Sequence, residues 1–540
     1  MNQIIKKHWR FLAMAILITT MSSLTAVFVQ FEKGRVLDFA LARQANEAFR
    51  SGAILLALIL LELASYYAFN IYSSKFFLNG VKSLREAFFT AILKRKYPDF
   101  RSKAQGEYLA MYTDQIDKVQ KQYIETIIWV FEISIKALTV SIGLFILDWR
   151  LALITLFLLT TPLYVPKIVE NKLQKAQKES AKVFEAHLAK FTDWLNGFEL
   201  IKNFSIENKI LGKFRESNTL VYATDYRRQI LNYRFWLVSS SLSYLSHFII
   251  IVFAGSLVLK GDFSAGDFFV AVGMIDQLSM PILALSVYMQ NFIAVKPVRK
   301  DLENFIAFQP EKVATRDLSA SSEIQVVFQD VGFAYVPENP ILSGFNLKAS
   351  SPEHVLLTGP NGSGKSTSMS LLLNYYKTQQ GTVTINGMTV NKISNLPQII
   401  TVMRQDSTFF EDSLRENLRV YQDISDSELI NMLKRVDLDK FASKSGLDMR
   451  LQSDATNLSG GEKRRIALAR ALLRDAPILI LDEPLANIDQ NSQLIIEELI
   501  SGISDKLVFL ISHQLSDNMA QRFDQVIRFE DQRTNHGKSD

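Results

Sequence analysis

Long uncharged stretches of apolar residues crowd residues 1–305 and vanish from the rest of the chain. Six of them are close to the roughly 20 residues that a helix needs to cross a bilayer. One such stretch could be a buried helix of a soluble core, and the first could be a signal peptide, but six in succession favour a membrane domain. The predicted spans are residues 11–29, 52–72, 127–147, 151–169, 236–259 and 268–295.

The connections between the predicted spans alternate between short and long. The third is only Asp148-Trp149-Arg150, whereas those after the second and fourth spans are long, rich in Lys and Arg, and carry apolar residues at helical spacing. Basic connections and a basic N-terminus are typical of the cytoplasmic side. The spans are therefore predicted to continue as helical rods into the cytoplasm, and six spans return the C-terminus to that side.

Composition also divides the chain into domains. A polar linker without periodicity, residues 306–322, follows the membrane domain of residues 1–305, and residues 323–540 alternate strand-like and helical patterns as an α/β domain does. A net charge of +5 is too mild to indicate a nucleic-acid partner. The absence of cysteine excludes disulfides, thiolate metal sites and a cysteine nucleophile.

A glycine-rich loop lies between the strand-like segment His354–Thr358 and a helical segment predicted from Lys365 to Tyr375. It fits G-x-x-x-x-G-K-[ST], in which glycines turn backbone N–H groups toward phosphate oxygens and the helix N-terminus adds positive charge. Lys365 is predicted to reach the β- and γ-phosphates, and Ser366 to help hold Mg²⁺. The alternative, an accidental glycine-rich turn, is disfavoured by the rest of the domain. The predicted nucleotide loop comprises Gly359, Pro360, Asn361, Gly362, Ser363, Gly364, Lys365, Ser366 and Thr367.

Two carboxylates follow a continuous apolar run at residues 477–481. Such a run is typical of a buried parallel strand, and functional groups of parallel sheets lie at the carboxyl ends of the strands. One acid at a strand end is common, but two acids downstream of a phosphate loop favour catalysis. Asp482 is predicted to bind Mg²⁺, and Glu483 to polarise the attacking water as a general base.

A second glycine turn, Leu458-Ser459-Gly460-Gly461-Glu462, opens a helical segment and predicts another anion site. Together with the phosphate loop and the paired acids, this turn resembles the LSGGQ signature of ATP-binding cassette (ABC) transporters of the exporter type, with Glu462 in place of the glutamine. The chain resembles a half-transporter of that family over nearly its whole length. The resemblance implies a six-helix all-α transmembrane domain with long intracellular helical extensions, followed by an α/β P-loop ATPase domain.

The resemblance also implies roles for single residues. Tyr335 would stack on adenine, Gln405 would contact Mg²⁺ and the membrane domain, Asp489 would face a partner subunit, and His513 would contact the γ-phosphate. The implied catalytic set is Glu483, His513, Lys365 and Gln405, and the implied Mg²⁺ ligands are Ser366, Gln405 and Asp482. The implied ATP site is completed by Tyr335, Ser459, Gly460, Gly461, Glu462 and Asp489.

In this family the phosphate loop of one ATPase domain faces the signature of another, so one chain implies a dimer. Because every catalytic position is filled, a homodimer is favoured, and a paralogous half-transporter remains an alternative. The expected function is an ATP hydrolase, using ATP and Mg²⁺, that exports an amphipathic peptide, lipid or drug by alternating access. Its place is the cell membrane, the bacterial inner or plasma membrane, with the N-terminus and ATPase domain cytoplasmic. An importer built on the same scaffold stays open.

Charged groups inside the predicted spans are costly and usually face a cavity. Glu132 and Lys136 are four residues apart and could simply neutralise each other, whereas Glu62 has no such neighbour. The fifth span is rich in serine, which also lets helices pack closely. The predicted cargo-cavity residues are Glu62, Glu132, Lys136, Tyr244 and His247.

Overall fold

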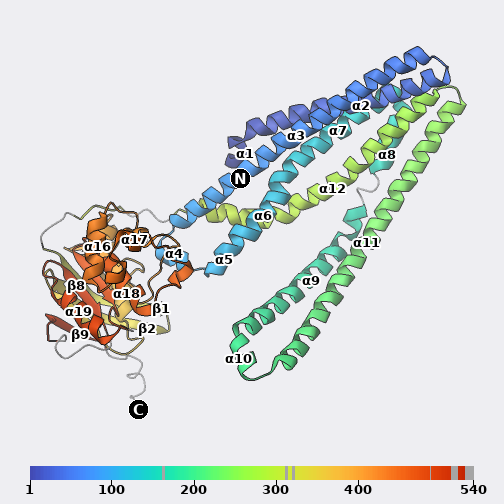
Figure 1. Cartoon of the computed structure of the whole chain (residues 1–540). Helices are drawn as coiled ribbons and strands as arrows, with labels where there is room; N and C mark the ends of the chain where they lie inside the picture. Colours follow the sequence, from blue (N-terminus) through green and yellow to red (C-terminus); the bar gives the residue numbers. More distant parts are fainter. Residues whose placement is uncertain (161–164, 310–313, 319–322, 487, 513–520, 530–540) are drawn as a thin grey trace. The chain divides into compact units, whose positions relative to one another are not determined.

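The computed structural model describes residues 1–160, 165–309, 314–318, 323–486, 488–512 and 521–529. The chain divides into two compact units, one of residues 1–94 and 103–308 and the other of residues 95–102 and 309–540 (Figure 1). Among the described residues, the first unit contains helices and the turns that join them, and the second combines helices with two sheets. The expected architecture, an all-α domain followed by an α/β domain, is confirmed. One short helix from the first long connection, α4 (Tyr97–Arg101), belongs to the second unit.

Long helices make up the first unit (Figure 1). Two segments, Met111–Gln115 and Gln120–Ile124, have the wider π-helical turn within the rod that leads from α5 to α7. The helices are α1 (Asn2–Lys7), α2 (Trp9–Leu41), α3 (Ala45–Leu93), α5 (Gln105–Ala110), α6 (Ile116–Val119), α7 (Glu125–Leu147), α8 (Trp149–Thr160), α9 (Val165–Asn196), α10 (Phe198–Asn203), α11 (Glu207–Leu259) and α12 (Ala265–Ala307).

Four helical stretches in the described part of the chain are long and apolar enough to cross a membrane: α2, α3, the rod Gln105–Leu147, and α11. They contain the first, second, third and fifth predicted spans. The fourth predicted span begins on the shorter α8 and runs across residues 161–164, which lie outside the described residues, into α9. The sixth lies within α12, which has Pro281 and Pro297 in its interior. Six spans therefore stay a prediction.

Two apolar cores hold the first unit together. One gathers side chains of α2, α3, the α5–α7 rod and α12, where Phe88 stacks on Phe305 with ring centroids 5.0 Å apart. The other joins α2, α7, α8, α11 and α12 around buried side chains such as Leu144, Leu151 and Ile275. Because each core draws on helices far apart in sequence, burial of apolar area fixes their mutual arrangement.

The start of α12 is fastened to the end of α2. Asp38 Oδ2 accepts a hydrogen bond from Ser264 Oγ (2.7 Å), and Asp38 Oδ1 accepts one from the Gly266 N–H (2.8 Å). A Cβ atom on Gly266 would lie 2.3 Å from Asp38 Oδ2, and one on Gly34 would lie 2.5 Å from Val270. Glycine is required at both positions because the helices approach so closely.

The predicted cytoplasmic rods are helical. Helices α9 and α11 run side by side and are joined through the short α10 (Figure 1). Ser180 Oγ donates to Asp225 (2.6 Å), and His187 Nδ1 lies 2.9 Å from Ser217 Oγ. Side-chain hydrogen bonds thus join the two rods at two levels.

The second unit contains an antiparallel sheet of order β2-β1-β4-β5 and a parallel sheet of order β6-β7-β8-β3-β9. The strands are β1 (Gln325–Val336), β2 (Asn339–Ser350), β3 (His354–Thr358), β4 (Gln380–Ile385), β5 (Met388–Thr389), β6 (Ile400–Met403), β7 (Ile478–Asp482), β8 (Leu507–Ile511) and β9 (Gln525–Arg528). The helices are α13 (Lys365–Leu372), α14 (Leu396–Ile399), α15 (Leu414–Arg419), α16 (Asp426–Arg435), α17 (Lys444–Leu447), α18 (Gly460–Leu473) and α19 (Gln490–Ser501).

The parallel sheet places the predicted catalytic loops at one edge. All five residues of β7 and of β8 are buried, as expected for strands covered on both faces. β8 pairs with β3 on one side and β7 on the other, with Leu357 and Asp482 both opposite Ile511. The loops that follow β3 and β7 therefore leave the sheet from the same edge.

Two predicted boundaries differ from the structure. Helix α13 ends at Leu372 instead of Tyr375, because Asn374 adopts a left-handed backbone with φ of 54°. Helix α12 continues to Ala307, so the first residues of the predicted linker are helical. Part of that linker, residues 310–313 and 319–322, lies outside the described residues.

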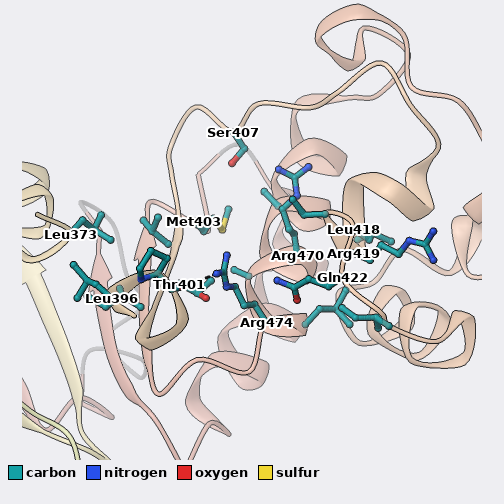
Figure 2. A pocket seen from close by; sticks show the side chains of 18 of the residues that line it. Leu373, Leu396, Thr401, Met403, Ser407, Leu418, Arg419, Gln422, Arg470 and Arg474 are labelled. Carbon is teal, nitrogen blue, oxygen red and sulfur yellow. Dashed lines mark hydrogen bonds between the residues drawn. The ribbon is translucent and has the colours of Figure 1, made fainter. Parts of the chain in front are cut away.

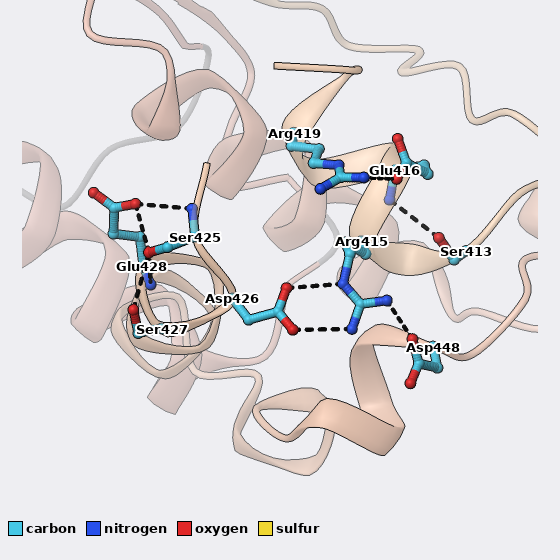
Figure 3. Close-up of polar contacts among 9 residues, drawn as sticks. All are labelled: Ser413, Arg415, Glu416, Arg419, Ser425, Asp426, Ser427, Glu428 and Asp448. Carbon is cyan, nitrogen blue, oxygen red and sulfur yellow. Dashed lines mark hydrogen bonds and ion pairs between the residues drawn. The ribbon is translucent and has the colours of Figure 1, made fainter. Parts of the chain in front are cut away.

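A charged network joins the helices α15, α16 and α17 (Figure 3). The Arg415 guanidinium donates to both carboxylate oxygens of Asp426, at 2.8 and 3.1 Å, and also contacts Asp448. Hydrogen bonds to these carboxylates raise the pKa of Arg415, and the hydrogen bond from Arg415 lowers the pKa of Asp426. Ser425 and Glu428 form a capping box at the start of α16.

Candidate functional site: a nucleotide cavity

The glycine-rich loop between β3 and α13 has the backbone geometry of a phosphate cradle. Gly359, Gly362 and Gly364 have φ of 146°, 82° and 106°, a region that disfavours other residues. At Gly359 a Cβ would lie 2.3 Å from the carbonyl oxygen of Phe529, so a larger residue has no room there. The loop ends at Gly364 and α13 begins at Lys365, so the N-terminus of the helix lies at the loop.

Lys365 lies inside the loop, with only 5% of its surface exposed. Its Nζ donates to the carbonyl oxygens of Gly359 and Pro360, each at 2.7 Å. Burial lowers the pKa of Lys365, and the nearby carboxylates of Glu483 and Asp482 oppose that effect. A phosphate would replace the two carbonyl oxygens as the partner of this buried ammonium. The exchange is favourable because a hydrogen bond between two charged groups is stronger than one to a neutral group.

Asp482 ends β7 beside the loop. Ser366 Oγ lies 3.5 Å from Asp482 Oδ1. Burial raises the pKa of Asp482, and Ser366, Arg404 and Lys365 oppose the rise. A hydroxyl and a buried carboxylate are oxygen donors of the kind that Mg²⁺ prefers, so these two residues fit the predicted metal site.

Glu483 follows with a positive φ of 52°, and its N–H donates to the Ile511 carbonyl oxygen at 2.9 Å. Its Oε2 accepts a hydrogen bond from Gln405 Nε2 at 2.8 Å. A strained, hydrogen-bonded backbone at a non-glycine residue is a common feature of residues held for catalysis. Gln405 and Glu483, which the sequence predicts separately as site residues, are thus in direct contact although they are far apart in the chain.

Tyr335, at the end of β1, lies beside the start of α13. It is 53% exposed, and its hydroxyl is 3.2 Å from Thr367 Oγ1. Its ring packs edge-on against Phe333 and Tyr376, with centroids 5.0 and 5.2 Å apart. Because about half of its surface is exposed, Tyr335 can still contact a planar ligand.

These groups line a cavity of about 850 Å³. Its volume falls in the range of ligand pockets. Gly359, Pro360 and Ser363 belong to the same loop but are not among the described residues that line the cavity. The Ser363 hydroxyl is buried and has no hydrogen-bond partner within the described part of the chain. The predicted site residues that line the cavity are Tyr335, Asn361, Gly362, Gly364, Lys365, Ser366, Thr367, Gln405, Asp482 and Glu483.

The signature turn has a different setting. Ser459 is the N-cap of α18, and it forms a capping box with Glu462: the Ser459 N–H donates to Glu462 Oε2 (2.7 Å), and the Glu462 N–H donates to Ser459 Oγ (3.3 Å). Lys440 forms an ion pair with the Glu462 carboxylate. In the described part of this chain, residues 459–462 do not line the nucleotide cavity.

Asp489 caps helix α19 instead of lining the cavity, since its Oδ1 accepts the Ser492 N–H at 3.0 Å. This hydrogen bond lowers the pKa of the Asp489 carboxyl group. Two arginines of α18 hold the same region: Arg464 donates to the Ala486 carbonyl oxygen, and Arg465 donates to Ser492 Oγ at 2.8 Å. His513 lies outside the described residues.

A second cavity of about 330 Å³ opens between α14 and β6 on one side and α15 and α18 on the other (Figure 2). Its walls are apolar, from Leu396, Met403 and Leu418 among others, with Arg419 and Arg474 among the polar residues. Tyr375 also lines it, and α4 reaches that residue: the rings of Tyr97 and Tyr375 stack with centroids 4.1 Å apart.

The predicted cargo residues of the helical unit lie on α3, α7 and α11. Glu132 and Lys136 form an ion pair on α7, as their spacing allows. His247 Nε2 on α11 lies 3.1 Å from Asp276 Oδ1 on α12, and Ser279 Oγ is 3.3 Å from the imidazole. Tyr244 is 76% exposed one turn before His247. Glu62 is half-buried on α3.

Sequence reasoning missed several partners that the tertiary structure supplies. Lys440 contacts the signature from a turn preceding α17, and Tyr376 supports Tyr335. The Arg404 guanidinium lies 5.2 Å from the Tyr375 ring centroid, next to Gln405 in the chain. The Tyr375-Tyr376 doublet directly after the phosphate-loop helix could have indicated from the sequence that an aromatic residue supports Tyr335. Lys440 belongs to no such pattern.

Comparisons with known proteins agree with this arrangement. A family model described as ABC transporter matches residues 342–486, and one described as ABC transporter transmembrane region matches residues 12–282.

Similar curated proteins span most of the chain. The uncharacterised ABC transporter ATP-binding protein YfiC of Bacillus subtilis (strain 168) is 26% identical, covering 97% of this chain and 89% of YfiC. The multidrug resistance-like ATP-binding protein MdlB of Buchnera aphidicola subsp. Schizaphis graminum (strain Sg) is 26% identical, covering 86% and 81%. A fatty acid ABC transporter ATP-binding/permease protein of Mycobacterium bovis is 26% identical, covering 77% and 67%.

Among solved structures, a bacterial Atm1-family ABC exporter with ATP bound superposes with a TM-score of 0.80. The match covers 98% of this chain and 94% of the exporter chain, at 18% sequence identity. It shows a shared fold.

Proposed function

The chain belongs to the ABC transporter family, and from that premise we propose that it is one half of a dimeric exporter that hydrolyses ATP to move an amphipathic cargo across a membrane. The observation that carries the proposal is the convergence of Lys365, Ser366, Gln405, Asp482 and Glu483 on one cavity, in a chain that also contains a large membrane unit. Each of these side chains has the chemistry that phosphoryl transfer from ATP to water requires.

The cavity residues divide the reaction between them. The backbone N–H groups of the loop and the Lys365 ammonium hold the phosphates and offset their charge. Mg²⁺, when bound, would neutralise charge that develops on the phosphates, and Ser366 and Asp482 are the residues that would hold it. Glu483 orients a water molecule and accepts its proton as the water oxygen bonds to the γ-phosphorus, and ADP leaves.

Gln405 is suited to position the base. Its amide donates to Glu483 Oε2 at 2.8 Å. Because a carboxylate has two oxygens that together accept several hydrogen bonds, this contact orients Glu483 and still leaves acceptor sites for a water molecule.

A second subunit supplies the missing side of the site. The signature residues lie away from the cavity of their own chain, while Ser459, Gly460 and Gly461 form a helix N-terminus suited to a phosphate. Two copies that face each other would place each signature against the other copy's nucleotide. A homodimer suits a chain with a complete hydrolytic set, and a paralogous partner would satisfy the same geometry.

The rods offer a means of coupling within such a dimer. Helix α10 exposes Phe198 and Leu200, each 58% exposed, and carries the acidic Glu199 between them. The second cavity combines apolar walls with arginines (Figure 2). It would therefore suit the exposed apolar and acidic side chains of α10 from a partner copy. Because the chain has no cysteine, Leu200→Cys in one tagged copy and Gln422→Cys in another would place the only thiols at this contact. A disulfide between copies is expected, and its absence would reject the contact.

The membrane unit suggests the class of cargo. Asp276 is 69% exposed at its side chain and pairs with His247, while Tyr244 presents an aromatic ring one turn away. A carboxylate on a membrane helix is costly facing lipid, so it is expected to face a cavity. Aromatic, imidazole and carboxylate groups together suit an amphipathic cargo with a polar or cationic head. Two relatives have names that mention multidrug resistance or fatty acids, which fits such a cargo.

The test is reconstitution of the purified chain in lipid vesicles of known orientation. We expect ATP hydrolysis that is lost in Lys365→Ala, native mass spectrometry that gives a dimer, and ATP-dependent movement of an amphipathic cargo away from the side that carries the ATPase domain. Hydrolysis that survives Lys365→Ala would reject the catalytic assignment. Movement toward the ATPase side would identify an importer, and a purely monomeric, inactive protein would reject the homodimer.

A further inference from the structure

The signature of this chain carries a negative charge where the family pattern has a neutral glutamine. Glu462 Oε2 accepts the Ser459 N–H, and the carboxylate also pairs with Lys440. Burial opposes ionisation of Glu462, but hydrogen bonds from Lys440 and Ser459 prevail and lower its pKa. The turn that faces a partner's nucleotide therefore contains a carboxylate ion, which by itself repels the phosphates.

The turn that carries Lys440 is fixed to the signature helix. Arg465 of α18 donates to the Asp437 carbonyl oxygen (2.7 Å) and to Asp437 Oδ2 (2.6 Å). Phe441, which is 8% exposed, anchors the other end of the turn in the apolar core, and Lys440 Nζ lies 4.7 Å from its ring centroid. Lys440 and Glu462 are therefore held by one rigid region and are expected to move together.

We propose that Lys440 is a positioning residue for the ATPase reaction: it neutralises Glu462 so that the signature turn can accept the γ-phosphate of a nucleotide bound by the partner subunit. The inference rests on the proposed function, because it needs a nucleotide between two copies. Lys440 is exposed and belongs to none of the sequence motifs that line the nucleotide cavity. An ordinary surface ion pair is the alternative, and it would contribute only slightly to stability.

The variant Glu462→Gln tests the effect of the charge without a change in the shape of the side chain. A glutamine three residues after the N-cap also completes a capping box, so Glu462→Gln keeps the local geometry and removes only the charge. The test compares ATPase activity against ATP concentration for the reconstituted wild type, Lys440→Met, Glu462→Gln, and the double variant. Lys440→Arg keeps the positive charge, and Lys434→Met removes a different exposed lysine from α16 as a matched control.

We expect Lys440→Met to raise the KM for ATP by about three- to tenfold, with a smaller change in kcat, because an uncompensated carboxylate weakens nucleotide binding. Glu462→Gln is expected to lower KM, and adding Lys440→Met to it should change KM by less than about 1.5-fold. Lys440→Arg should stay within about twofold of the wild type, as should Lys434→Met.

The inference is overturned if Lys440→Met raises KM equally in both backgrounds, because Lys440 would then affect nucleotide binding independently of Glu462. It is also overturned if Lys440→Met leaves KM unchanged, and a lowered thermal unfolding midpoint in that case would mean that Lys440 acts only through folding. These outcomes differ from a failure of the proposed function, which would appear as ATPase activity absent from the wild type or insensitive to Lys365→Ala.

Discussion

The two units hold their polar groups in different ways. Around the nucleotide cavity, the Lys365 ammonium donates to two backbone carbonyl oxygens of its own loop, and the Glu483 N–H donates to the Ile511 carbonyl oxygen of β8. In the helical unit, His247 and Asp276 hold each other through side chains on separate helices. A backbone-held site keeps one geometry, which suits catalysis, whereas a site shared between helices changes when the helices move. The comparison thus assigns fixed chemistry to one unit and adaptable binding to the other.

The largest expected effect tests the rigid site. Glu483→Gln keeps the size of the side chain and removes the proton acceptor, so ATP turnover should fall by about 100-fold or more while ATP binding persists. Steady-state hydrolysis and retention of labelled nucleotide would measure both. Glu498→Gln, an exposed glutamate on α19, is the matched control and should keep wild-type turnover. Undiminished turnover in Glu483→Gln would remove this residue from catalysis.

A smaller effect is expected in the shared site. Asp276→Asn leaves His247 with a neutral partner and removes the negative charge, so stimulation of ATPase activity by a cationic amphipathic cargo should fall by about three- to tenfold. The measurement is the ratio of stimulated to unstimulated hydrolysis over a cargo panel. Glu216→Gln, on the part of α11 that extends beyond the predicted span, should keep the wild-type ratio. Identical cargo profiles in the wild type and Asp276→Asn would contradict a cargo-binding role.

The smallest effect concerns stability of the second unit. Arg415→Met removes the partner of Asp426 and Asp448, and the thermal unfolding midpoint of the detergent-solubilised chain should fall by about 1–3 °C at neutral pH. The pKa of Asp426 is lowered in the folded protein, so the contribution of the pair is complete above the ordinary carboxyl pKa of 3.8 and is lost as the pH falls through the folded value.

The pH dependence supplies the check on that prediction. The difference in midpoint between the wild type and Arg415→Met should shrink as the pH falls below 3.8. A difference that persists unchanged under those conditions would show that packing of the Arg415 side chain, and not its charge, stabilises the three helices (Figure 3).

Much of the nucleotide site could be predicted because its parts are local. The strand His354–Thr358, the loop and the helix start at Lys365 follow one another in the chain, and the structure has the strand at the predicted residues. The helix after the signature and the buried strand before Asp482 were likewise predictable from short patterns. Helix ends were less so, since the left-handed turn at Asn374 depends on a single residue.

The sequence by itself determined the division into a membrane and an ATPase domain, the phosphate loop and the acids at a strand end, because these depend on runs and spacings within a few turns of chain. Only the tertiary structure decided that Gln405 holds Glu483, that Lys440 compensates Glu462, and that His247 meets Asp276. The physical reason is that such contacts arise where separate elements pack, and packing is set by the buried area of whole helices and sheets, which no local pattern records.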